Sequence, residues 1–140
     1  MVKHAFPPIV DENSKILILG TMPGEKSLQR NQYYAHKNNQ FWKIIFILFQ
    51  QPLTEHYDAR KAILLKNHIA LWDVLKACEG EGSSDKNIMN AVPNDFVSFY
   101  KRYPKIKKIT LLPATMSGHA LMSCSYNVCF SLCFIYLFQR

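Results

Sequence analysis

The sequence predicts a single α/β domain in which helices cover a mostly parallel sheet, and two sets of observations support this fold class. Short apolar runs with the composition of buried strands occur at residues 15–20, 68–73 and 107–112. Helices are expected at residues 39–50, where apolar side chains recur at helical spacing, and at 58–67 and 94–102. Strands that alternate with helices pair in parallel, so the sheet is expected to be mostly parallel.

The predicted strands place three loops at one edge of this sheet. In parallel α/β sheets, ligands bind at the carboxyl ends of the strands, which here are followed by the loops after Leu19, Trp72 and Leu112. The first loop contains Pro23 and Gly24, which interrupt regular structure. A further loop is expected at residues 80–85.

Composition restricts the class of protein and of partner. The 140 residues are 49% hydrophobic and 19% charged, which is typical of one folded domain and excludes a disordered chain. The formal net charge of +7 favours an anionic partner, and nucleic acid is the first candidate because lysines that contact phosphates release counterions. We expect a monomer.

The termini and cysteines indicate a cytoplasmic protein without metal or cofactor. No apolar segment follows the first eight residues as it would in a secretory signal, so the four cysteines are expected to be free thiols. Their spacing matches no paired zinc-binding pattern. The apolar run 128–138 is shorter than the roughly twenty residues of a membrane span, so no contact with a membrane is expected.

Two segments carry residues suited to binding a nucleobase. The loop 20–24 can present backbone N–H groups, and Tyr33 and Tyr34 offer aromatic faces on which a base can stack. Shortly after them, Asn38, Asn39 and Gln40 carry amides that can bond a base edge. The alternative is that the tyrosines are core residues and that Asn38 or Asn39 caps the following helix.

The order of these motifs resembles the hypoxanthine-DNA glycosylase branch of the uracil-DNA glycosylase superfamily. The resemblance covers about residues 14–110, and it rests on Gly-Thr-Met-Pro-Gly at 20–24, Tyr-Tyr-Ala-His at 33–36, Asn-Gln-Phe-Trp at 39–42, Ile-Ala-Leu-Trp-Asp-Val at 69–74, Gly-Ser-Ser-Asp at 82–85 and Pro-Asn-Asp at 93–95. It implies a three-layer sandwich around the sheet. It also implies a DNA repair enzyme that flips a deaminated base, hypoxanthine or uracil, out of the duplex and hydrolyses its N-glycosidic bond.

The resemblance also implies roles for individual residues. Most members of the superfamily carry Asp or Asn where this chain has Met22, and the hypoxanthine branch is thought to use the asparagine that corresponds to Asn39, which would orient the attacking water. Tyr34 would stack on the flipped base. The predicted base-binding residues are Tyr34, Gly20, Met22, Pro23 and Gly24. Further candidates for pocket or DNA contacts are Thr21, His36, Asp73 and Ser84. For Asp73 a structural role at the strand end is the favoured alternative, and for Ser84 the alternative is helix capping.

The C-terminal part of the sequence argues against a simple assignment. Residues 111–140 do not fit the branch, so its last strand and much of its DNA-inserting loop are expected to be missing. This leaves a catalytically inactive or truncated relative that only binds nucleic acid as an alternative. A small-molecule or nucleotide-binding α/β domain is a third hypothesis, which rests on the glycine-rich loop alone and is weakened because residues 20–24 match neither phosphate-binding glycine motif. The basic run 101–108 is interpreted as a solvated helix end more than as a phosphate contact.

Overall fold

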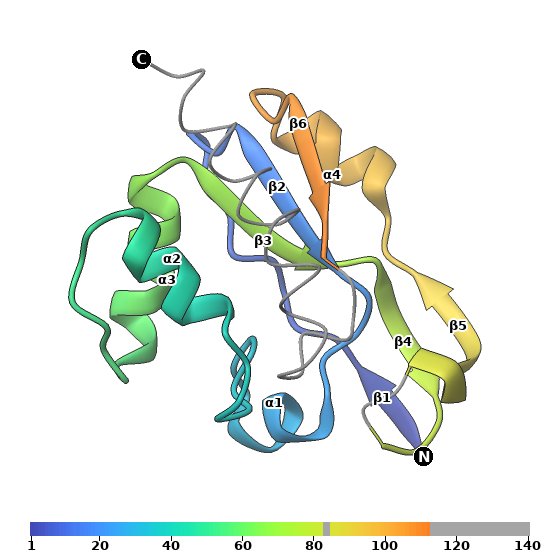
Figure 1. Ribbon diagram of the computed structural model, residues 1–140. Coiled ribbons are helices and arrows are strands. Elements are labelled where there is room, and N and C mark those ends of the chain that lie inside the picture. Colours follow the sequence, from blue (N-terminus) through green and yellow to red (C-terminus); the bar gives the residue numbers. More distant parts are fainter. Residues whose placement is uncertain (83–84, 113–140) are drawn as a thin grey trace.

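The computed structural model describes residues 1–82 and 85–112 as two small sheets with helices around one of them (Figure 1). The strands are β1 (Val2–His4), β2 (Ile16–Gly20), β3 (Ile69–Asp73), β4 (Leu75–Glu79), β5 (Met89–Pro93) and β6 (Lys108–Leu111). The helices are α1 (Glu25–Arg30), α2 (Phe41–Leu48), α3 (Tyr57–Lys66) and α4 (Phe96–Arg102), with a 3-10 turn, η1, at Asp85–Asn87.

The parallel sheet has the strand order β3-β2-β6, and it forms the middle of a three-layer arrangement. Every residue of β2 and β3 is buried, because both faces of these strands are covered. Along β2, Ile18 packs into a cluster with residues of α2 and α3, whereas Leu17 and Leu19 pack into a second cluster with Phe99 of α4. The predicted α/β fold with a parallel sheet and helices on both faces is therefore confirmed.

The predicted elements agree with the structure to within two residues at each end. The strands expected at 15–20, 68–73 and 107–112 are β2, β3 and β6, and the helices expected at 39–50, 58–67 and 94–102 are α2, α3 and α4. The last helix begins later than expected because Asp95 is its cap: the Asp95 carboxylate accepts the N–H of Ser98 at 3.0 Å.

The second sheet was not predicted. Its order is β1-β4-β5 and all its pairs are antiparallel, so the view of the whole chain as one parallel sheet is incomplete. These strands bury few side chains, since all five residues of β5 are exposed and Lys3 is the one buried residue of β1. Their sequences therefore contain no apolar run that would predict a strand. β1 forms because Val2–His4 pairs with Glu79–Ala77, which lies more than seventy residues away in the chain, whereas β5 pairs with the nearby strand β4. The short helix α1 was also not predicted.

Replacing Ile18 by Ala tests which side chains stabilise the fold. Ile18 is fully buried in the cluster under α2 and α3, so its truncation is expected to lower the free energy of unfolding by about 2–5 kcal/mol. Urea denaturation measures the loss. Ile109→Ala in β6 is the matched control, because Ile109 is 52% exposed, and it is expected to change the free energy by less than about 1 kcal/mol. Equal losses at both positions would contradict the assigned core.

Candidate functional site

The edge at which β2 and β3 end is built by their parallel register. Gly20, the last residue of β2, is paired with Asp73, the last residue of β3. Beyond the pair, the N–H of Val74 donates to the Gly20 carbonyl at 2.8 Å, and the N–H of Leu75 donates to the Thr21 carbonyl at 3.1 Å. The loop after β2 is therefore held against the junction of β3 and β4, and Thr21 takes part through its backbone.

Gly20, Asp73 and Tyr34 meet at this edge. A Cβ atom at Gly20 would lie 2.6 Å from Oδ1 of Asp73 and 3.1 Å from the hydroxyl oxygen of Tyr34, so a side chain at position 20 would have to displace one of them. Asp73 is only 3% exposed. The sequence favours a structural role for Asp73 over a pocket contact, whereas the structure places its carboxylate beside Gly20 and Tyr34, two predicted base-binding residues.

The hydroxyl group of Tyr34 is buried without a hydrogen-bond partner among the described residues, although the residue as a whole is only partly buried. Burial raises the pKa of Tyr34 far above its ordinary value, and the nearby charge of Asp73 raises it further. The hydroxyl therefore stays protonated and can act as a donor. A buried, unsatisfied donor is costly, and such groups are concentrated at functional sites.

The backbone around Tyr34 is held by three side chains. The N–H of Tyr33 donates to the hydroxyl oxygen of Tyr57 at 3.1 Å, and the indole N–H of Trp42 donates to the Tyr33 carbonyl at 2.8 Å. The N–H of Ala35 donates to the buried Ser27 hydroxyl at 3.2 Å. Tyr34 itself has a φ of 53°, in the left-handed region that residues with a Cβ rarely adopt. Such a conformation costs about 1–3 kcal/mol and persists only where surrounding contacts impose it.

These holding residues were not recognised from the sequence. Trp42 was noted in the Asn-Gln-Phe-Trp motif only as a packing residue, and Ser27 and Tyr57 carried no recognisable signal. The contacts connect α1, α2 and α3 to one short loop, and such connections between distant segments appear only in the folded chain.

Asn39 lies at the start of α2, and its side-chain oxygen is already used. Oδ1 of Asn39 accepts the N–H of Phe41, the first residue of α2, at 2.8 Å. The residue at the capping position is Gln40, whose side chain makes no capping hydrogen bond, so the prediction that Asn38 or Asn39 caps this helix is wrong. Its Nδ2 donates no hydrogen bond within the described part of the chain, and the side chain is half-buried. The ring of Phe41 lies against that of Tyr34, with the centroids 4.3 Å apart and an interplanar angle of 30°. Asn39 and Tyr34 are thus joined through Phe41.

The remaining predicted site residues lie elsewhere or are not described. His36 is exposed, and its Nδ1 accepts the N–H of Asn38 at 3.1 Å, which supports a local role. Gly24 precedes α1 in an extended conformation, and its carbonyl accepts the N–H of Leu28. Ser84 lies outside the described residues.

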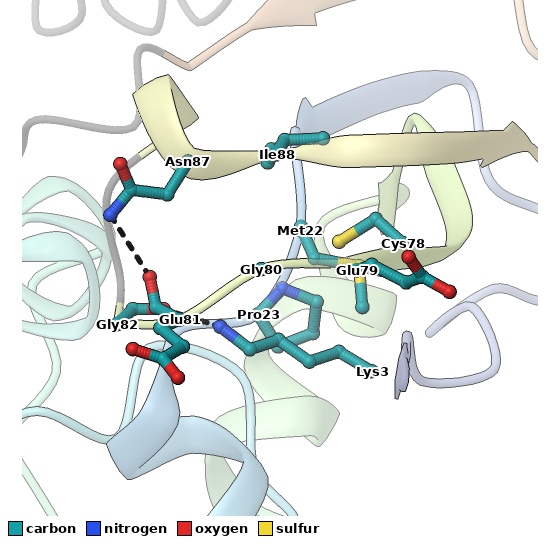
Figure 2. A pocket seen from close by; sticks show the side chains of 10 residues that line it. All are labelled: Lys3, Met22, Pro23, Cys78, Glu79, Gly80, Glu81, Gly82, Asn87 and Ile88. Atoms are coloured by element: carbon teal, nitrogen blue, oxygen red, sulfur yellow. Dashed lines mark hydrogen bonds between the residues drawn. The ribbon is translucent and has the colours of Figure 1, made fainter. Parts of the chain in front are cut away.

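Met22 and Pro23 line a small hollow that does not include Tyr34, Asn39 or Asp73 (Figure 2). Its other walls are Lys3 of β1 and residues Cys78–Gly82, Asn87 and Ile88 from the second sheet and its turn. Lys3 is buried, and its ammonium group donates to the Gly82 carbonyl. The hollow and the cluster of Gly20, Asp73 and Tyr34 therefore share no residue, although Met22 and Pro23 follow Gly20 closely in the chain.

Comparison with known proteins decides the family. The family model described as the uracil DNA glycosylase superfamily matches residues 7–114. The chain belongs to this superfamily. Its relatives include the hypoxanthine DNA glycosylase of Methanosarcina barkeri, which is 39% identical over 110 residues, 78% of this chain and 70% of that protein. The protein of the same description from Methanosarcina acetivorans is 38% identical over the same shares.

The fold comparison agrees with this assignment. The solution NMR structure of a candidate uracil DNA glycosylase from Methanosarcina acetivorans matches with a TM-score of 0.75 and 31% identity, over 87% of this chain and 89% of that chain. Together with the sequence relatives, it confirms the resemblance to the hypoxanthine branch stated above.

The described residues of this superfamily member hold no group of three or more potential metal ligands. They also contain no helix with the length and apolarity needed to cross a bilayer.

Two substitutions of the same kind test the hydrogen bonding around Tyr34. Tyr57→Phe removes the acceptor of the buried Tyr33 N–H and is expected to lower the free energy of unfolding by about 1–3 kcal/mol. Tyr34→Phe removes a buried hydroxyl that has no partner among the described residues, so it is expected to leave stability unchanged or raised. Thermal and urea denaturation measure both. A loss at Tyr34→Phe as large as at Tyr57→Phe would contradict this account.

Alkaline pH is expected to destabilise the fold through the buried tyrosines. Burial, followed by the charge of Asp73, raises the pKa of Tyr33 and of Tyr34 in the folded chain, whereas the unfolded chain loses these protons near pH 10. Above about pH 10 the unfolded state binds fewer protons, so stability falls as pH rises and is intact below that value. Tyrosinate absorbance followed with denaturation measures this. Tyr34→Phe should reduce the slope by one proton, and an unchanged slope would contradict the assignment.

Proposed function

We propose that this chain is a monofunctional DNA glycosylase that hydrolyses the N-glycosidic bond of a flipped deaminated base, with hypoxanthine preferred to uracil. The observation that carries the proposal is the Tyr34–Phe41–Asn39 arrangement at the carboxyl edge of the parallel sheet, in a chain whose relatives are named hypoxanthine DNA glycosylases. The preference for hypoxanthine follows those names.

In this proposal Tyr34 supplies the surface against which the extruded base lies. One face of its ring contacts Phe41, and its backbone is held in a strained conformation by contacts from three helices. A ring fixed in this way loses little conformational freedom when a base stacks on it, and such stacking is worth about 1–3 kcal/mol. The protonated hydroxyl of Tyr34 adds a donor at the bottom of the site.

Asn39 positions the attacking water in this proposal. Because its Oδ1 accepts the Phe41 N–H, the amide orientation is fixed and Nδ2 remains available to the water or the base. A neutral amide is not a strong base, and the thioether of Met22 cannot remove a proton. The reaction is therefore expected to be dissociative: the C1′–N bond breaks first and the base leaves with the bonding electrons. Water then adds to the oxocarbenium-like sugar and releases a proton, which balances the proton that the departing base takes up.

Base release from duplexes with one deoxyinosine or one deoxyuridine tests the proposal. Asn39→Ser keeps a side-chain oxygen for the Phe41 N–H but removes the amide, so we expect normal stability and release slowed by about 100-fold or more. Asn38→Ser is the matched control, because Asn38 is an exposed neighbour, and it should release the base at the unsubstituted rate.

Each outcome of this experiment has a distinct meaning. Equal rates for Asn39→Ser and Asn38→Ser would show that Asn39 only supports the start of α2. A folded, unsubstituted chain that binds DNA but releases no base from duplex or single strand would overturn the enzymatic proposal and support a relative that only binds nucleic acid.

A further inference from the structure

Basic side chains gather at the amino end of the parallel sheet, opposite the candidate site. The N–H groups of Lys107 and Lys108 donate to the Lys15 carbonyl at 2.9 and 3.3 Å, which brings the starts of β6 and β2 together. The ammonium group of Lys105 bonds Oδ1 of Asn13 at 2.9 Å, just before Lys15. The amino-end basic surface consists of Lys15, Arg102, Lys105, Lys107 and Lys108, all of them exposed.

The charges of this surface are not neutralised within the described part of the chain. The ion pairs found there join Arg60 to Glu55 and Lys61 to Asp58, and neither includes a member of the surface. Two carboxylates share this end, those of Asp11 and Glu12, and Asp11 already accepts hydrogen bonds from the Asn13 N–H and the Ser14 hydroxyl. Five cations therefore face two anions, a density of like charge that attracts a polyanion.

The surface is too far from the candidate site to bind the same phosphates. β2 begins beside Lys15 and ends at Gly20, and at about 3.3 Å per residue its five residues separate the two ends by roughly 13 Å. The buried sheet lies between them. In Figure 1 the start of β6 is at the top, whereas α1, which follows the loop after β2, is at the bottom.

We propose that the amino-end basic surface is a second DNA-binding surface, which holds the phosphate backbone of an undamaged duplex segment while the opposite edge is free to take a damaged base. The basic run 101–108 was interpreted from the sequence as a solvated helix end. The structure adds Lys15 from a distant segment and finds no ion pair for these cations among the described residues. DNA is chosen among polyanions because of the proposed function.

A bridging experiment with undamaged DNA tests this surface. One duplex carries a donor dye and another an acceptor dye, and energy transfer reports a protein bound to both. The full chain is expected to bridge them at low salt, and Lys107→Gln/Lys108→Gln is expected to reduce bridging at least fivefold. The slope of log affinity against log salt for a single duplex should become shallower by about two, since each phosphate contact contributes about 0.9.

The matched control is Lys61→Gln/Lys76→Gln, which removes the same charge elsewhere on the molecule and should retain bridging. Single-turnover base release by Lys107→Gln/Lys108→Gln should be unchanged. Equal bridging by the two double variants would overturn the inference. The inference would also be overturned if binding to anionic vesicles depended on Lys107 and Lys108 and binding to DNA did not. Variant-sensitive bridging by a chain that releases no base would support this inference and contradict the proposed function, so the two can fail separately.

Discussion

The register of β2 against β3 is the constraint on which the candidate site depends. Because the two strands run in parallel and in register, Gly20 and Asp73 end side by side at the same edge, and the carboxylate of Asp73 occupies the space that a side chain at position 20 would need. The Tyr34 hydroxyl lies at the same point. A shift of one residue would turn every side chain of β2 to the other face of the sheet, so the two buried clusters and the site are fixed together.

The conformation of Tyr34 shows how the surrounding structure supports this arrangement. A left-handed tyrosine and a buried hydroxyl with no partner among the described residues both cost free energy. Contacts from Ser27, Trp42 and Tyr57, each on a different helix, offset that cost by satisfying the neighbouring backbone groups. The result is a partly exposed residue in a fixed position, which suits the proposed stacking of an extruded base on Tyr34.

The two ends of the parallel sheet carry different kinds of residues. At its carboxyl ends lie Gly20, the buried Asp73 and the hydroxyl of Tyr34, whereas five exposed cations lie around the starts of β2 and β6 at its amino ends. At the carboxyl ends, burial lowers the local dielectric constant and so strengthens each polar interaction. At the amino ends, solvent and salt screen each contact between a cation and a phosphate. The two proposals therefore place specific recognition of a base and unspecific attachment to a polyanion at opposite ends of one small domain.

The sequence by itself determined the parallel sheet and the helices on its two faces. Strands buried on both faces are continuous apolar runs, and helices between them carry an apolar periodicity, so both are visible without the partner segment. The motifs around Gly20, Tyr34 and Asn39 likewise indicated the superfamily. The sequence left open whether Asn39 supports a helix or serves a reaction, because one amide can do both, and the structure shows that its oxygen serves the helix while its nitrogen remains available.

Only the tertiary structure decided the rest. The antiparallel sheet β1-β4-β5 has no apolar pattern of its own, and its pair β1-β4 joins segments more than seventy residues apart. The residues that hold Tyr34, the approach of Asp73 to Gly20, and the meeting of Lys15 with Lys107 and Lys108 are all contacts between distant segments. Local sequence carries no information about which distant groups will meet, because the chain pays the entropy of closing those loops only when it folds.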